Sequence, residues 1–509
     1  MDQTVSDNNE RLTHPFGKRQ ILAILVVVLA LYIVLRIWSL WTPYLWGDEV
    51  FTFSLSQGSW ITLIKRAGLD MAHPPLFYLL LKLWIYVVGS SMVGLRILTV
   101  SFSIAAVFPL IALARRLGFQ MPVIILALTL MAINNYLVLY SYYLRSYSLL
   151  LLLSLSSQAL FVAFLRSPPS VQKRTLLVLT FINILFLYTH YFALLVIIAE
   201  YLWVVATDRT HLRQLTISTA IIILSFLPWV GVIAYVSTQV SYTFLDQISW
   251  YYPPGVYNLF LLLRSFNGGF DSKRLTLAGG IIFLLIILYA LTYSFLRADS
   301  ADRKPERSLN AYALLAWLSF FPVVVSFAFS EVFTWIWVPR YVIVASGSYL
   351  LLVSASAFRF RNPYLRTLAI VFLLAWSSIA GFTDNLTEVL HGPNGTSFLL
   401  ARDLSQKETR SVGPISIYGI SPYAEQGLRL ALNLTGEGRF ETKPCSPDVM
   451  FSDDYFWLAV TEHDPTAMTR VKELSSGQLY DLGEPIYRGE FPQRHMLIPV
   501  HRRITRSIL

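Results

Sequence analysis

Long runs of apolar residues, separated by short polar segments, fill the first three-quarters of this chain. Eleven such runs lie near residues 21–41, 92–114, 121–140, 147–165, 175–190, 191–207, 215–236, 275–296, 310–330, 341–357 and 366–382. The hydrocarbon core of a bilayer is about 30 Å thick, so a crossing helix needs roughly 20 apolar residues. The pattern predicts a polytopic α-helical membrane protein with about 11 transmembrane helices. The fifth and sixth runs are nearly continuous, which requires a tight turn near His190.

The run from Pro75 to Gly89 is short, follows a proline and contains Lys82. If this run lies in the interface rather than crossing, the loops on the side of the N-terminus hold 17 basic residues and the opposite membrane-proximal loops hold nine. If this run crossed the membrane, every later loop would change sides, and the excess of basic residues would lie on the opposite side. Because short cytoplasmic loops are enriched in Lys and Arg, the count favours eleven crossings. It places the N-terminal tail, residues 1–20, in the cytoplasm and the C-terminus outside.

The composition changes after the last apolar run. Residues 383–509 hold 16 of the 30 acidic residues, and their apolar runs are short: PISIYGI, YFWLAV and HMLIPV. These runs are typical of strands, and Tyr423 to Leu432 has a helical pattern. The chain therefore divides into the tail 1–20, a membrane domain 21–382 with a first outer loop 42–91, and a small soluble extracytoplasmic α/β domain 383–509.

Composition supports the membrane assignment and limits the function. Apolar residues make up 55% of the chain and charged residues 14%, against about 25% charged in soluble domains. The net charge of +10 is explained by basic cytoplasmic loops, so we expect no nucleic-acid partner. A single cysteine, Cys445, excludes an intramolecular disulfide. The first apolar run has no small-residue cleavage site, which indicates an uncleaved signal anchor.

The first outer loop carries two adjacent carboxylates, Asp48 and Glu49, between aromatic residues. One explanation is a solvated pair. The flanking aromatics instead favour a position at the membrane interface. There, a carboxylate can act as general base toward an acceptor hydroxyl or bind a divalent cation such as Mg²⁺ or Mn²⁺. Adjacent residues face different ways on a helix or strand, so we expect two distinct roles.

Further polar residues lie at the same predicted outer face. His73 precedes Pro74-Pro75, which suits the start of a helix whose positive dipole end attracts anions. Arg145 lies among tyrosines and Arg340 starts the tenth run. Each arginine either reaches toward lipid headgroups or clamps a phosphate. His190 is either a packed histidine or a ligand. Glu200 lies within a run and is costly there unless paired.

Five segments together resemble the GT-C glycosyltransferases over roughly residues 20–360: WGDE, HPPLFYLLL, SYYLRSYSLLLLLSL, YTHYFALL and PRYV. The resemblance is to the bacterial multi-pass mannosyltransferase-like branch, and more distantly to protein O-mannosyltransferases and lipid A aminoarabinose transferases. It implies a bacterial plasma-membrane enzyme with a polyprenyl-phosphate sugar donor, inverting transfer on the non-cytoplasmic face, and frequent dependence on a divalent cation. The loop 237–274 is too short for the domain inserted in protein mannosyltransferases, which weakens the inference of a protein acceptor.

The resemblance also implies roles for individual residues. Asp48 matches the catalytic base, and Glu49 matches a neighbour that assists with acceptor or metal. His73, Arg145 and Arg340, with Tyr341 of the PRYV segment, match positions near the donor phosphate. The match of His190 adds a tentative third metal ligand to Asp48 and Glu49.

The residue types fit the chemistry without the family. A sugar on a lipid phosphate has a good leaving group, and cations can take the charge that develops on the phosphate. One base and no covalent nucleophile gives inversion. The predicted function is transfer of one sugar from a polyprenyl phosphate to an extracytoplasmic glycan, lipid or protein. Two alternatives remain: a transporter or flippase of lipid-linked glycans, and a polysaccharide polymerase or ligase using a diphosphate donor.

Overall fold

The computed structural model describes residues 17–41, 47–239, 255–270, 272–298, 310–333, 336–391 and 396–408, and shorter segments after them: 415–419, 428–429, 432, 439–444, 454–461, 469, 471–473, 480–488 and 495–502. The chain forms two compact units. The first unit comprises Met1–Trp41, Leu55–Val87 and Leu95–Leu386. The second unit comprises Thr42–Ser54, Val88–Gly94 and Thr387–Leu509. Most of the tail 1–20 lies outside the described residues.

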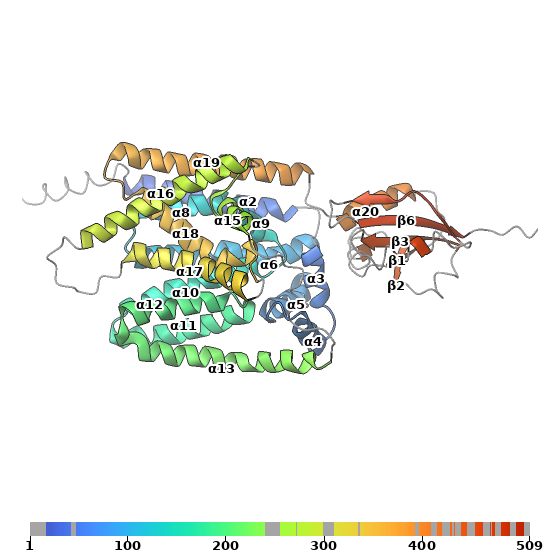
Figure 1. Ribbon diagram of the computed structural model, residues 1–509, viewed down its shortest axis with the longest axis horizontal. Helices are drawn as coiled ribbons and strands as arrows, with labels where there is room; N and C mark the ends of the chain where they lie inside the picture. Colours follow the sequence, from blue (N-terminus) through green and yellow to red (C-terminus); the bar gives the residue numbers. More distant parts are fainter. Residues whose placement is uncertain are drawn as a thin grey trace, which may run out of the picture. The chain divides into compact units, whose positions relative to one another are not determined.

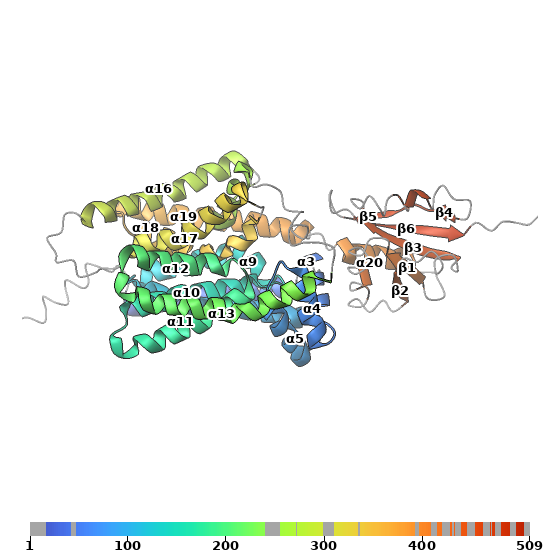
Figure 2. The same cartoon turned by 60° about the horizontal axis from the view of Figure 1, so that its bottom comes forward.

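The first unit is helical, and its long helices run alongside one another (Figure 1, Figure 2). The helices are α2 (Lys18–Trp38), α4 (Trp60–Asp70), α5 (Leu76–Val88), α6 (Met92–Ala105), α7 (Val107–Arg116), α8 (Met121–Ile133), α9 (Asn135–Tyr142), α10 (Tyr147–Arg166), α11 (Pro169–Thr189), α12 (Ala193–Thr207), α13 (Leu212–Ser237), α15 (Val256–Asn267), α16 (Lys273–Ala298), α17 (Ala311–Val332), α18 (Ser346–Ala357) and α19 (Pro363–His391), with short 3₁₀ turns η1 (Ser39–Trp41), η2 (Arg209–His211) and η3 (Pro339–Ala345).

The prediction of a polytopic membrane protein is confirmed. In the described part of the chain, nine helices are long and apolar enough to cross a membrane, and ten if the bent pair α8 and α9 is one span. The remaining predicted crossing is α12, which is apolar but has only 15 residues. The chain turns between α11 and α12 over three residues, His190 to Phe192, as the continuous apolar pattern required.

Helix α5 forms in the short apolar run between Pro75 and Gly89, which was predicted not to cross the membrane. Its 13 residues span about 20 Å at 1.5 Å per residue, which is too short for a bilayer core of about 30 Å. The ammonium of Lys82 is buried and donates to the carbonyls of Ser56 and Gly58. These bonds tie α5 to the loop before α4, so the expectation of a helix that does not cross is consistent with its length and contacts.

The centre of the first unit is α18 with η3. Every residue from Tyr341 to Ala357 is buried. The hydroxyl of Ser154 on α10 donates to the carbonyl of Val344 at 2.6 Å, which joins α10 to η3 and fixes Tyr341 relative to α10. Glu200 is buried on α12, and its Oε1 accepts from Ser157 Oγ on α10 at 2.8 Å. This is the partner that a carboxyl inside an apolar span requires.

The second unit is built on a mixed sheet (Figure 1). Its strands are β1 (Ile415–Gly419), β2 (Phe440–Pro444), β3 (Tyr455–Thr461), β4 (Tyr480–Leu482), β5 (Ile486–Arg488) and β6 (His495–Arg502), in the order β2-β1-β3-β6-β4 with β5 also on β6. β1 is parallel to β2 and β3, and β6 is antiparallel to β3, β4 and β5. The three runs predicted as strands are β1, β3 and β6. Most of Tyr423–Leu432, predicted helical, lies outside the described residues, as does Cys445.

Both faces of this sheet are buried. Ile417, Trp457 and Leu497 face one core together with Leu400 and Leu404 of α20 (Thr396–Lys407). Phe456, Leu458 and Ile498 alternate with them and face a second core. This alternation is the period-2 pattern of strands with two covered faces, and it confirms the predicted α/β character of the C-terminal segment.

Candidate functional site

A chain of three polar side chains lies at the end of α4 and beside the start of α10. The carboxylate Oδ2 of Asp70 is 3.1 Å from His73 Nδ1, and His73 Nε2 is 3.3 Å from Arg145 Nη2. A guanidinium only donates, so His73 Nε2 accepts and Nδ1 carries the proton that Asp70 accepts. His73 and Arg145 are both 5% exposed. The histidine is thus a neutral link between a carboxylate and a guanidinium.

A strained turn brings Asp70 and His73 together. Met71 ends α4 with φ of 53°, the left-handed region that non-glycine residues avoid. Met71 is buried, and its carbonyl accepts from the hydroxyl of Tyr191 at 3.1 Å. Four residues after Met71, Pro75 precedes the first turn of α5, whose start at Leu76 matches the helix predicted from the prolines. Backbone strain held by tertiary contacts is a feature of functional sites.

Two further predicted residues pack on His73. The ring centroids of His190 and Tyr341 lie 5.3 Å and 6.0 Å from that of His73, and 4.5 Å from each other. Arg340, half-buried, has its guanidinium carbon 5.8 Å from the centre of the Tyr341 ring. We call Asp70, His73, Arg145, His190 and Tyr341, with Arg340 at their edge, the His73 cluster. Five of the predicted site residues are therefore gathered in the first unit.

The surroundings of His190 determine its protonation. Burial lowers its pKa well below 6.5, and the positive charges of Arg145 and Arg340 nearby lower it further. Its Nδ1 accepts from the backbone N–H of Phe192 at 3.2 Å, which leaves the single proton of the neutral ring on Nε2. The structure therefore favours a neutral His190 in one tautomer.

This depressed pKa has a consequence for stability. As pH falls through about 6.5, His190 becomes protonated in the unfolded chain but stays neutral in the folded chain. The free energy of unfolding therefore decreases as pH falls. We expect His190→Asn, whose amide oxygen can accept from Phe192, to reduce the slope of stability with pH below 6.5 by at most about 1.4 kcal/mol per pH unit. Melting curves of the purified protein between pH 4.5 and 7.5 measure this slope. Parallel curves for the two proteins would contradict the assignment.

His190 does not fit the predicted metal. Its Nδ1 already accepts a hydrogen bond, its Nε2 bears the proton in that tautomer, and arginines surround it. A cation ligand needs a free nitrogen lone pair and negative neighbours. In the described residues no three His, Cys, Asp or Glu side chains gather as a metal site. Mg²⁺ or Mn²⁺ binding by Asp48 and Glu49 stays a prediction.

The two acidic residues of the first outer loop lie in the second unit. Sequence reasoning treats them as loop residues, but they form the first turn of helix α3 (Gly47–Leu55), where carboxylates are stabilised by the helix dipole. Glu49 is fully buried, whereas Asp48 is half-buried. This difference agrees with the expectation that the two have distinct roles. That they share a site with the His73 cluster stays a prediction.

Helix α3 is anchored in the core of the C-terminal domain. Val50 is buried in the same cluster as Leu400, Leu404 and Trp457, and Phe53 packs against that cluster. The residue before Val50 is Glu49, and Asp48 is one further, so the domain fixes the segment that carries both carboxylates. Sequence reasoning assigned no role to residues 383–509. Positioning α3 is a role that the contacts support.

We expect Leu404→Ala, at a fully buried position, to destabilise the second unit by about 2–5 kcal/mol and to loosen α3. Hydrogen exchange of residues 47–54 should accelerate. The matched control is Leu458→Ala, which removes an equally buried leucine from the opposite face of the sheet. If both variants accelerate exchange in α3 equally, α3 is not held specifically by the core that contains Leu404.

Sequence reasoning missed residues that complete the cluster. Asp70 was not predicted to pair with His73, although the Asp-x-x-His spacing is the signal for it. A small pocket is lined by His73, Arg145 and Tyr78, with Pro74, Phe77, Ser146 and Thr189. Tyr147 and Tyr143 stack at 6.1 Å beside it. No signal in a single sequence indicates which tyrosines of the tyrosine-rich segment around Arg145 face the interior.

No family model and no curated protein matches the sequence. Solved structures do match over nearly the whole chain. The ArnT protein of Cupriavidus metallidurans, solved with undecaprenyl phosphate, is 9% identical with a TM-score of 0.60, covering 95% of this chain and 98% of its own. Its apo form gives 12% identity and the same TM-score, covering 93% of this chain and 97% of its own.

A second similar structure is the oligosaccharyltransferase AglB of Archaeoglobus fulgidus, solved with an inhibitory peptide and a dolichol phosphate. It is 14% identical with a TM-score of 0.51, covering 92% of this chain and 70% of its own. At these identities the likeness concerns the fold. The chain has the fold of the multi-pass GT-C membrane proteins, as the sequence segments predicted.

Proposed function

We propose that this protein is a membrane glycosyltransferase that moves a single sugar, a hexose or pentose, from a polyprenyl phosphate to an acceptor glycan, lipid or protein outside the cytoplasm. The observation that carries the proposal is the buried chain Asp70–His73–Arg145 with Arg340 beside it. The shared fold supports it, because ArnT was solved with undecaprenyl phosphate and AglB with a dolichol phosphate.

The cationic side of the cluster suits the donor phosphate. Arg145 lies at the edge of a small pocket, close to the N-terminal end of α10, and Arg340 precedes the buried Tyr341. Guanidinium groups bind phosphate oxygens through paired N–H donors. Asp70 fixes the tautomer of His73. His73 Nε2 then accepts one N–H of Arg145, and this bond orients the remaining guanidinium N–H groups. In this proposal His73 is a positioning residue.

The reaction balances without a further reactant. The bond between the anomeric carbon and the phosphate oxygen breaks, and its electron pair stays on the phosphate, where Arg145 and Arg340 stabilise the added charge. The acceptor oxygen forms the new bond to the anomeric carbon from the opposite face, which inverts the configuration. The hydroxyl proton passes to the carboxylate of Asp48, a general base that suffices when the leaving bond is largely broken first.

Glu49 has a supporting role in this proposal. Because it is fully buried while Asp48 is half-buried, Asp48 is the carboxylate that an acceptor can reach. If the reaction uses Mg²⁺ or Mn²⁺, the carboxylates of Asp48 and Glu49 would hold the ion, which would supply further charge for the phosphate. The N-terminus lies in the cytoplasm and the C-terminal domain outside, in a bacterial plasma membrane.

Mass spectrometry of lipid that copurifies with the full chain tests the proposal. A polyprenyl phosphate carrying one sugar is expected, and incubation with acceptor should release unglycosylated polyprenyl phosphate. A diphosphate-linked glycan would indicate a polymerase or ligase instead. Movement of intact lipid-linked glycan across proteoliposomes, with no sugar transferred, would indicate a transporter or flippase.

A further inference from the structure

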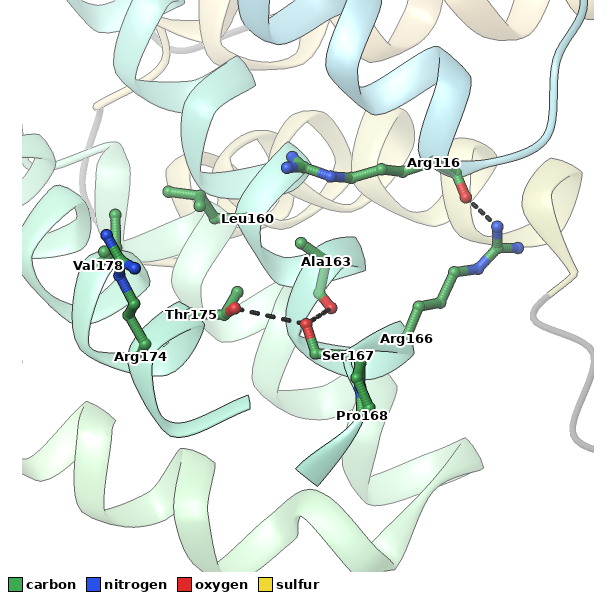
Figure 3. A pocket seen from close by; sticks show the side chains of 9 residues that line it. All are labelled: Arg116, Leu160, Ala163, Arg166, Ser167, Pro168, Arg174, Thr175 and Val178. Atoms are coloured by element: carbon green, nitrogen blue, oxygen red, sulfur yellow. Dashed lines mark hydrogen bonds between the residues drawn. The ribbon is translucent and has the colours of Figure 1, made fainter. Parts of the chain in front are cut away.

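A second basic site lies at the opposite end of α10 from the His73 cluster. A cavity of about 380 Å³ is formed where α7 and α10 end and α11 begins (Figure 3). Its lining includes Arg116, Arg166 and Arg174. Helix α10 has 20 residues and is therefore about 30 Å long, with Tyr147 at one end and Arg166 at the other. The cavity, which we call the arginine pocket, is thus about one bilayer thickness from Arg145.

The charges of the arginine pocket are unbalanced. Arg166 donates to the backbone carbonyl of Arg116 (Figure 3). Arg116 in turn donates to the carbonyl of Ala159 at 3.0 Å. Both bonds go to neutral oxygens, and each guanidinium has five N–H groups. Across the described residues, none of the three arginines forms an ion pair, and Arg174 has no hydrogen bond. All three arginines are exposed, and guanidiniums gathered around one cavity favour the binding of an anion with several oxygen acceptors.

Two hydroxyls complete the polar part of the lining. Ser167 Oγ donates to the carbonyl of Ala163 at 2.7 Å and lies 3.4 Å from Thr175 Oγ1 (Figure 3). Ser167 lies just before α11 and Thr175 in its second turn, where the Thr175 hydroxyl also donates to the carbonyl of Val171 at 3.1 Å. The donors around this cavity that suit phosphate oxygens are therefore the guanidinium N–H groups.

The rest of the lining is apolar and faces lipid. Leu160 and Val178 form part of the wall. Val178 is 42% exposed and its neighbour Leu177 61% exposed, on a helix that is long and apolar enough to cross the membrane. The pocket therefore joins a cationic rim to a surface that acyl chains cover. Basic pockets between membrane helices bind the headgroups of anionic lipids, whereas a free phosphate would gain nothing from the apolar wall.

We propose that the arginine pocket binds the headgroup phosphate of an anionic phospholipid in the leaflet opposite the His73 cluster. The phosphate lies among Arg116, Arg166 and Arg174, and one acyl chain follows Leu160 and Val178 toward the bilayer centre. The bound lipid neutralises the three charges and fixes the ends of α7, α10 and α11. This site is separate from the donor site and does not depend on the proposed function.

Native mass spectrometry of the full chain tests this binding, with phosphatidylglycerol and phosphatidylcholine of identical acyl chains. We expect at least one phosphatidylglycerol to be retained, and the double variant Arg166→Gln/Arg174→Gln to retain it roughly tenfold less tightly. The matched control is Arg115→Gln/Lys173→Gln, which removes the same charge from two basic residues that are exposed, as Arg166 and Arg174 are, but do not line the pocket. This control variant should retain phosphatidylglycerol as tightly as the unmodified chain does.

Three results would overturn the proposal: equal retention of the two lipids, equal losses in the variant and its control, or displacement by millimolar inorganic phosphate, which would indicate a free-anion site. If the double variant fails to fold, Arg174→Gln alone decides, since this side chain has no hydrogen bond in the described structure to lose. Binding of the lipid to that single variant at unchanged affinity would also reject the site.

Discussion

Asp48→Asn is expected to slow sugar transfer by about 10²- to 10⁴-fold, the contribution of a positioned general base. Asparagine keeps the size of the side chain and the start of α3, but it cannot accept a proton at neutral pH. Because the donor phosphate is proposed to bind at Arg145 and Arg340, retention of polyprenyl-phosphate lipid should be unchanged. Single-turnover transfer from a defined donor measures the rate, and native mass spectrometry measures the retained lipid.

Glu49→Gln is the matched comparison for this prediction. Glu49 is fully buried in the adjacent position, so its substitution alters packing and support of α3 rather than the proton transfer itself. A smaller loss of rate, together with a lower melting temperature, is expected. Wild-type turnover by Asp48→Asn would exclude Asp48 as the base, and a larger loss for Glu49→Gln would exchange the two roles.

The elements that the sequence predicted correctly rest on local patterns. The apolar runs give the membrane helices because burial of each run in lipid is decided by its own composition. Pro75 gives the start of α5 because a proline restricts the backbone of its own turn. The three strands of the C-terminal sheet follow from short apolar segments, whose residues face two buried cores in turn.

The features that sequence reasoning missed depend on contacts between distant residues. Val50 is buried with Leu404 and Trp457, more than 350 positions later, and nothing in the segment around Val50 indicates that partner. Likewise, the αL turn at Met71 is held by Tyr191, from the distant turn between α11 and α12. The sequence alone predicted His73, Arg145, His190 and Arg340 at one face, but the packing of His73, His190 and Tyr341 against each other required the fold.

The arginine at position 145 links the polar chain to the proposed leaving group, so its loss has two separable effects. Arg145→Gln removes the cation that would stabilise the departing phosphate and the N–H that His73 Nε2 accepts. We expect a loss of about 10²- to 10³-fold in kcat/KM for the donor, comparable to removal of one preorganised donor at a developing charge. Initial rates at varied donor and fixed acceptor concentration measure this loss.

Comparison variants distinguish charge from structure at Arg145. Arg145→Lys keeps the charge without the planar fork and should recover part of the rate. His73→Asn removes the acceptor for the Arg145 N–H but leaves the guanidinium in place. If His73 only orients Arg145, this variant should lose less kcat/KM for the donor than Arg145→Gln does. Arg66→Gln, at an exposed position on α4, should leave donor kinetics unchanged. If Arg145→Gln alters the acceptor KM alone, Arg145 does not bind the donor phosphate, and the cluster must instead recognise the acceptor.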